Sequence, residues 1–172
     1  MGFCMFSSET YGIQDCMLYD ATEYSRTGTG SATCVATNSK TWDNTVNWEF
    51  TADIKVTGAA SRIDITPPSQ SLNYHLGIGE NAASQLATYV GKNGGGEDTI
   101  AHTSYSINDG TYYTVKITRE NGTIKYYFNG NLVRTETTYA NVWIDNYSTE
   151  SVKFTTWRSN SVYIKNMKIK PL

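Results

Sequence analysis

Two Asn-Gly dipeptides, eight residues apart, constrain the fold of this chain more than any other feature of its sequence. They are Asn121-Gly122 and Asn129-Gly130, and they separate three runs rich in Tyr, Val and Ile. Asn-Gly readily adopts the two positive φ angles that a tight β-hairpin turn requires. We therefore predict a three-stranded antiparallel meander over residues 112–137.

Alternation of apolar and polar residues predicts further strands along the chain. It is strongest in residues 48–56, where every second residue is apolar and is expected to face the core: Trp48, Phe50, Ala52, Ile54 and Val56. Residues 61–66 repeat the pattern, with two isoleucines inward and Arg62 and Asp64 outward. Each of these strands has one apolar face, which another layer of the protein must cover.

The same period places His75 on the polar side of a strand over residues 72–78, and we expect this histidine to be exposed on the sheet face. Two more alternating segments, 151–157 and 161–169, end the chain. The polar residues 158–160 separate them, so we predict that they close the chain as a last hairpin.

The composition supports a fold made of strands. Aromatic residues make up 13% of the chain, with 13 Tyr and 4 Trp, and such residues suit a pleated surface. No segment has a helical period of three turns. We predict a single all-β domain over residues 1–172, an antiparallel β-sandwich or jelly roll with about ten or more strands and almost no helix. Residues 41–172 are expected to form the core sandwich, and residues 1–40 an irregular N-terminal segment.

Charge and cysteine content exclude several classes of function. The net charge of −2 gives no electrostatic reason to expect a nucleic acid or an anionic membrane as partner. No apolar run is long enough for a membrane helix, and the first residues lack the features of a signal peptide. The three cysteines, Cys4, Cys16 and Cys34, have no C-x-x-C spacing, which argues against zinc. Free, mostly buried thiols are the simplest expectation, and a single disulfide bridge between two of the three is the alternative.

The meander sequence "YYTVKITRENGTIKYYFNGNLV" resembles the strand–turn–strand signature of concanavalin A-like jelly rolls, the laminin G and legume-lectin class. "WEFTADIKV" and the closing "VYIKNMKIKPL" are similar to other strands of these domains, so the resemblance covers residues 48–57 and 111–170. It implies two large curved sheets, of which the concave one commonly carries a glycan site. The family also contains glucanases, and similar modules occur in surface adhesins and in viral tail or fibre proteins.

An enzyme of this class needs two carboxylates close together, about 5–5.5 Å apart in retaining glycosidases. Glu49 and Asp53 share a strand face, but four residues of strand separate them by roughly 13 Å. Asp64 opposite Asp53 is the remaining pairing, and solvated carboxylates on a strand face are the simpler interpretation. Because no nucleophile motif is present either, we predict that the protein is not an enzyme.

A glycan site is expected where aromatic side chains lie beside polar ones, because sugar rings stack on Trp and Tyr while polar groups bond the hydroxyls. Trp143 and Trp157 both lie next to such polar residues. The alternative is that large aromatics fill the core or cap its ends. Our candidate ligand residues are Trp143, Asn146, Tyr147, Trp157, Arg158, Tyr89 and His75.

Calcium is a further expectation that the resemblance raises, since relatives bind it through loop oxygens. Three acidic loop residues are candidate ligands, namely Asp43, Asp109 and Asp145, and each has an Asn neighbour. Such residues more often form turns of the backbone. We therefore predict no required cofactor and keep calcium as an alternative.

Taken together, these features favour a non-catalytic carbohydrate-binding or adhesion module of a cell-surface or extracellular protein. Its expected partner is a glycan or cell-surface polysaccharide. The alternative is a viral structural protein, such as a tail, fibre or capsid-decoration component, with homo-oligomer or virion neighbours. The start at Met1 without a signal peptide favours that alternative. A glycoside hydrolase comes third.

Overall fold

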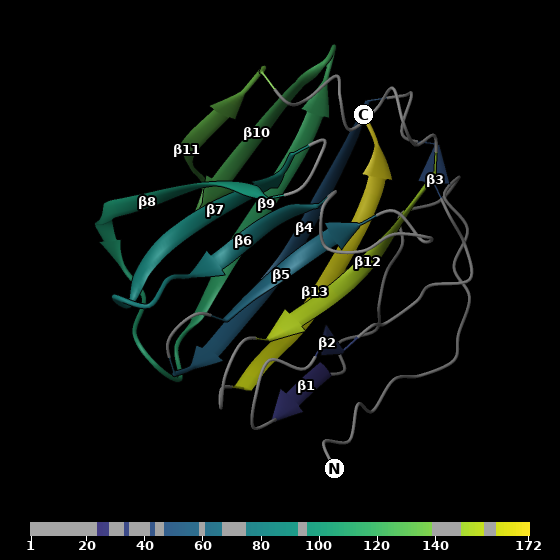
Figure 1. Cartoon of the computed structure of the whole chain (residues 1–172). Coiled ribbons are helices and arrows are strands. Elements are labelled where there is room, and N and C mark those ends of the chain that lie inside the picture. The colour runs from purple at the N-terminus through teal and green to yellow at the C-terminus, as the bar shows by residue number, and fades with distance from the viewer. Residues whose placement is uncertain are drawn as a thin grey trace.

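A computed structural model describes most of the strands of this chain and several of their connections (Figure 1). Within the described residues all regular structure is β-strand, and none of them forms a helix that could span a membrane. The described ranges are 24–27, 33–34, 42–43, 47–58, 61–66, 75–92, 96–138, 149–156 and 161–172.

The strands form two antiparallel sheets that lie one in front of the other (Figure 1). The six-stranded sheet has the order β1 (Tyr24–Thr27), β13 (Ser161–Pro171), β4 (Trp48–Thr57), β9 (Tyr112–Glu120), β10 (Thr123–Phe128) and β11 (Asn131–Glu136). The seven-stranded sheet has the order β2 (Thr33–Cys34), β12 (Thr149–Thr156), β5 (Ser61–Thr66), β6 (Leu76–Glu80), β7 (Gln85–Gly91) and β8 (Glu97–Ser106), with β3 (Trp42–Asp43) paired to β12. The prediction of an all-β sandwich is confirmed.

The meander β9–β10–β11 forms as the two Asn-Gly steps predict. Asn121 and Gly122 have φ angles of 49° and 75°, and Asn129 and Gly130 have 46° and 81°. The side chain of Asn129 also contributes to the second turn, because its Oδ1 atom accepts a hydrogen bond from the backbone N–H of Thr114 at 3.0 Å. The turn chemistry therefore fixes the register of all three strands.

The core lies between the two sheets and consists of the apolar faces that the alternation predicts. In β4 every second side chain is buried, from Trp48 to Val56. The meander contributes a matching set from the same sheet, and the seven-stranded sheet covers both. The largest fully buried side chains of the core come from both sheets and are Trp48, Tyr126, Phe50, Ile54, Ile63, Ile65, Leu76, Ile78 and Leu86. Burial of this apolar surface is the main term that stabilises the sandwich.

The prediction of a last hairpin is wrong. Strand β12 pairs with β5 in the seven-stranded sheet, whereas β13 pairs with β4 in the six-stranded sheet. The chain thus passes from one sheet to the other between them, through residues 157–160, which lie outside the described residues. A short polar connection suits a crossing between packed sheets as well as a hairpin, so the local sequence does not distinguish the two.

The pairing of Asp53 with Asp64 is also wrong, because β4 and β5 belong to different sheets. Asp53 instead accepts hydrogen bonds from Thr114 and Asn166, each at 2.7 Å, on the outer face of the six-stranded sheet. Glu49, on the same face of β4, pairs with Lys116 at 3.4 Å. Both acidic residues of β4 therefore hold neighbouring strands together.

Replacing Gly130 by alanine tests the contribution of the second turn to stability. A Cβ atom there would meet no other atom within 4 Å, so only the backbone angle of +81° is strained. We expect Gly130→Ala to lower the free energy of unfolding by about 1 kcal/mol, measured by urea denaturation. The control is Thr137→Ala, at an exposed position outside any strand. Equal midpoints for Gly130→Ala and the wild type would show that the turn does not constrain the fold.

Candidate ligand-binding face of the seven-stranded sheet

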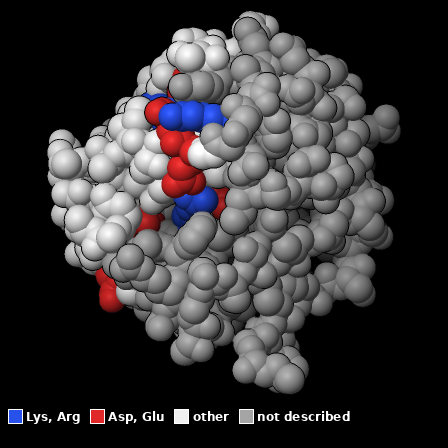
Figure 2. Space-filling view, viewed as in Figure 1, with Lys and Arg blue, Asp and Glu red and all other residues white. Residues whose placement is uncertain are grey.

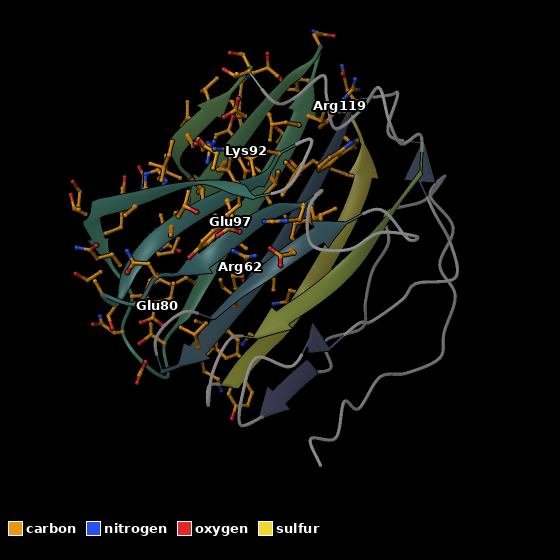
Figure 3. The ribbon with its side chains drawn as sticks, viewed as in Figure 1. Arg62, Glu80, Lys92, Glu97 and Arg119 are labelled. Carbon is orange, nitrogen blue, oxygen red and sulfur yellow. The ribbon has the colours of Figure 1, made fainter. Side chains whose placement is uncertain are left out.

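The outer face of β5 to β8 carries a group of polar side chains that come together across four strands. Residues opposite one another in antiparallel strands share a face, and the register joins Asp64 to Gly77 and Gly77 to Tyr89. It also joins Gly91 to Glu97. We call the five residues that meet there the polar cluster: Arg62, Asp64, His75, Tyr89 and Glu97. Figure 3 shows Arg62 and Glu97 on this face, with Lys92 beyond them.

Two glycines make room for the polar cluster. A Cβ atom on Gly77 would collide with the Oδ1 atom of Asp64 and lie 3.2 Å from the Cβ atom of Tyr89. Gly91 lies between His75 and Glu97, and its N–H donates to the backbone oxygen of His75 at 2.8 Å. With no side chain on Gly91, the imidazole can reach across the strand to the carboxylate. Glycine within a strand often marks such a close approach.

The polar cluster is joined by ion pairs and hydrogen bonds that converge on Glu97 and Arg62. The Nε2 atom of His75 lies 3.1 Å from the Oε2 atom of Glu97, and Arg62 donates to that same oxygen at 2.8 Å. The Nε atom of Arg62 also donates to Asp64 at 3.2 Å. The guanidinium of Arg62 stacks on the ring of Tyr89, 4.3 Å from its centroid, an arrangement that suits a planar cation.

Four residues of the polar cluster are buried, and the fifth, Glu97, is accessible. Arg62, Asp64, His75 and Tyr89 are 4%, 0%, 1% and 7% exposed, whereas the side chain of Glu97 is 35% exposed. The predicted outward direction of Arg62 and Asp64 is confirmed, but the expected exposure of these residues and of His75 is wrong. Alternation assigns a side chain to a face, and it does not reveal whether that face is covered.

The surroundings of Glu97 keep it ionised. The hydrogen bond with His75 and the charge of Arg62 outweigh burial and lower the pKa of Glu97 to about 2. Burial raises the pKa of Tyr89 to about 12, so its hydroxyl stays protonated and donates to the backbone oxygen of Glu80 at 3.2 Å. For Arg62, burial opposes the charge but Asp64 and Glu97 raise its pKa overall. At neutral pH the accessible group is thus a hydrogen-bond acceptor.

The two oxygens of Glu97 have different partners among the described residues. The Oε2 atom receives Arg62 and His75, whereas the Oε1 atom accepts the hydroxyl of Thr99, at 3.2 Å. A carboxylate oxygen has two lone pairs. The Oε1 atom can therefore accept one more donor from outside the protein.

A second set of charges lies at the β7–β8 connection, where Asp98 is opposite the core residue Val90 and so points to the other side of β8 from Glu97. Lys92 lies 3.7 Å from Asp98, which also pairs with the buried Arg134 at 2.8 Å. In the space-filling view, most of the described charged side chains seen from this side form one band over β5 to β8, with both signs present (Figure 2). Charges of both signs are therefore close together at this edge of the sheet.

The structure places two of the predicted ligand residues, Tyr89 and His75, together in the polar cluster. The Oδ1 atom of Asp109, a predicted calcium ligand, accepts the backbone N–H of Gly58 at 3.0 Å. Across the described side chains, no group of three His, Cys, Asp or Glu is placed to hold a metal ion. The other candidates lie outside the described side chains, namely Trp143, Asn146, Tyr147, Trp157, Arg158, Asp145 and Asp43, the last having only its backbone described in β3.

Sequence reasoning did not assign Arg62 or Glu97 to a site and considered Asp64 only as a catalytic residue. Glu97 follows a glycine-rich loop and gave no periodic signal of its own. The sequence signal that could have indicated this site is the set of glycines at positions 77, 79 and 91. Three glycines within neighbouring strands predict a surface that other groups approach closely.

Comparisons with known proteins agree with this architecture. The family model described as the concanavalin A-like lectin/glucanases superfamily matches residues 27–161. No curated protein gives a significant match. A carbohydrate binding module, CBM66 from Bacillus subtilis, superposes with a TM-score of 0.61 at 12% identity, covering 94% of this chain and 99% of that one.

Two larger proteins contain the same fold. A structure of botulinum neurotoxin type C, described through its interaction with two ganglioside molecules, gives a TM-score of 0.55 at 16% identity, and the match covers 93% of this chain and 42% of that one. A sialidase gives 0.58 at 12% identity, with 89% and 16% covered. At these identities the comparisons establish the fold.

The lowered pKa of Glu97 predicts a pH-dependent contribution to stability. Because its folded pKa lies below the unfolded value of 4.5, Glu97 stabilises the fold above that pH, and the contribution is lost as the pH falls toward 2. We expect Glu97→Gln to lower the melting temperature at pH 6. The difference from the wild type should shrink as the pH falls from 5 toward 2, because the carboxyl group is protonated first in the unfolded chain and then, near pH 2, in the folded protein.

Glu120→Gln is the matched control, since Glu120 is half-exposed on the other sheet and pairs with Lys125 at 3.3 Å. This variant is expected to stay within about 0.5 kcal/mol of the wild type. A difference between Glu97→Gln and the wild type that stays constant from pH 6 to pH 3 would contradict the assigned ion pairs.

Proposed function

The chain belongs to the concanavalin A-like lectin/glucanases superfamily, and we propose that it is a non-catalytic carbohydrate-binding module whose glycan lies against the polar cluster. The observation that carries this proposal is the half-exposed carboxylate of Glu97, held from below by Arg62 and His75. Buried groups that fix one accessible polar group are typical of binding sites for small polar ligands.

The chemistry of Glu97 suits a sugar hydroxyl. An ionised carboxylate accepts hydrogen bonds that are stronger than those between neutral groups, worth about 1.5–3 kcal/mol each. Since Arg62 and His75 already orient this carboxylate, little conformational entropy is lost when a ligand binds. Lys92, at the β7–β8 edge of the sheet, pairs with Asp98 at 3.7 Å.

The same features argue against glycoside hydrolysis at this face. A glycosidase needs one carboxylic acid whose raised pKa keeps it protonated for the leaving group. Glu97 has its pKa lowered to about 2, and Asp64, the other carboxylate of the polar cluster, is fully buried. The accessible carboxylate of this face, Glu97, therefore lacks the raised pKa that a general acid needs.

The structural relatives support a glycan as ligand and an extracellular setting. One is described as a carbohydrate binding module, and another is described together with gangliosides, which are glycolipids of cell surfaces. Adhesion to a cell-surface polysaccharide is the role that fits both. In this proposal the chain contributes binding, and any catalytic activity belongs to other domains or proteins.

A glycan array followed by titration calorimetry tests the proposal. We expect selective binding that Glu97→Gln weakens at least tenfold, which corresponds to about 1.4 kcal/mol, because glutamine is a weaker acceptor and lacks the charge that pairs with Arg62. Glu120→Gln, on the opposite sheet, should bind as the wild type does. If Glu97→Gln keeps full affinity while it remains folded, the glycan does not contact the polar cluster.

Trp157 tests the predicted aromatic part of the site. Stacking of a sugar ring on this indole, expected from the sequence alone, predicts that Trp157→Ala weakens glycan binding by tenfold or more. Tyr163→Ala is the control, since Tyr163 is a half-buried aromatic residue of the six-stranded sheet. Equal losses in the two variants, or no loss in Trp157→Ala, would remove Trp157 from the site.

A further inference from the structure

The charges around Glu97 specify which sugars the face can accept. We infer that the polar cluster selects sugars without an acidic group and discriminates against those that carry a carboxylate, sulfate or phosphate. This inference rests on the proposed function, and it concerns the chemical class of the glycan. It follows from the way in which the cations of this face are already paired.

Arg62, the cation nearest to Glu97, is fully engaged. Its Nη1 atom donates to Glu97 at 2.8 Å, its Nε atom faces Asp64 at 3.1 Å, and its plane lies on Tyr89. An arginine that recognises an acidic sugar usually presents two parallel N–H groups to the incoming anion. Here the protein's own carboxylates already occupy that part of Arg62.

Lys92, at the edge of the face, is paired as well. Its ammonium group lies 3.7 Å from Asp98, and both side chains are 35% exposed. Arg134, the third cation nearby, is 2% exposed and contacts Asp98 at 2.8 Å and Glu136 at 2.6 Å. An anionic ligand would have to compete with these carboxylates for each cation.

The cations described around this face are matched by carboxylates. Asp64 and Glu97 both pair with Arg62, Glu97 also contacts His75, and at the β7–β8 edge Lys92 and Arg134 pair with Asp98 and Glu136. Since the pKa of Glu97 is about 2, its charge is present at any pH near neutrality. An acidic sugar placed on Glu97 would bring a second anion to a carboxylate that must remain ionised, and like charges at an interface strongly disfavour binding.

A neutral sugar meets no such repulsion. Its hydroxyl groups can donate to the second lone pair of the Glu97 Oε1 atom, which among the described residues accepts the hydroxyl of Thr99. The arrangement therefore favours ligands that supply hydroxyl donors over ligands that supply only acceptors.

The experiment compares matched pairs of oligosaccharides. Each neutral oligosaccharide that binds on the array is oxidised at C6, which converts a hydroxymethyl group into a carboxylate and leaves the rest of the sugar unchanged. Affinities are measured by titration calorimetry at about 20 mM and 200 mM NaCl, because repulsion between exposed charges weakens as salt is added. We expect the oxidised form to bind at least tenfold more weakly at low salt, with a smaller gap at high salt.

Glu97→Gln identifies the source of the discrimination. This variant should bind the neutral sugar more weakly than the wild type does, yet show a smaller gap between the neutral and oxidised forms. Glu120→Gln should keep the wild-type gap. Equal or tighter binding of the oxidised sugars, or a gap that Glu97→Gln leaves unchanged, would overturn the inference.

The outcomes also separate this inference from the proposed function. Binding of acidic sugars alone, weakened by Glu97→Gln, would leave a carbohydrate-binding module in place and overturn only its selectivity. Failure to bind any sugar, neutral or acidic, would overturn the proposed function and the selectivity together.

Discussion

The apolar layer between the two sheets is the constraint on which the rest of the structure depends. Without helices in the described part of the chain, each sheet can bury its apolar face only against the other. Two polar contacts then fix how the sheets lie, since the hydroxyl of Tyr126 donates to the backbone oxygen of Tyr89 at 3.0 Å and Arg134 donates to the backbone oxygen of Thr88 at 3.3 Å. Strand β7 is thereby held in place, and its outer face carries Tyr89 into the polar cluster.

A buried guanidinium imposes a second constraint on the outer face. Removing Arg62 from water is costly unless partners compensate its charge, and Asp64, Glu97 and the ring of Tyr89 supply that compensation from three different strands. The glycines at positions 77 and 91 are what allow these side chains to lie across neighbouring strands. Loss of either carboxylate would leave the buried charge of Arg62 less well compensated, so both are needed to offset the cost of its burial.

Local signals in the sequence predicted the parts of the fold that depend on local chemistry. The two Asn-Gly turns have the positive φ angles expected of them, and the alternation in β4 matches the buried set from Trp48 to Val56. The pairing of β12 and β13 with different sheets could not be predicted, because strand pairing depends on distant partners such as β5 and β4. For the same reason the burial of His75 and the position of Glu97, which lie 22 residues apart, emerge only from the folded sheet.

The environment that orients Glu97 also determines the kind of chemistry available to this face. A carboxyl group becomes a useful general acid when burial acts without a nearby cation, so that its proton is retained at neutral pH. Here the hydrogen bond with His75 and the charge of Arg62 outweigh the effect of burial on the pKa of Glu97. The residues that hold Glu97 at a fixed position therefore also keep it ionised. A rigid acceptor suited to binding and a proton donor suited to cleavage require opposite surroundings, and the polar cluster provides the first.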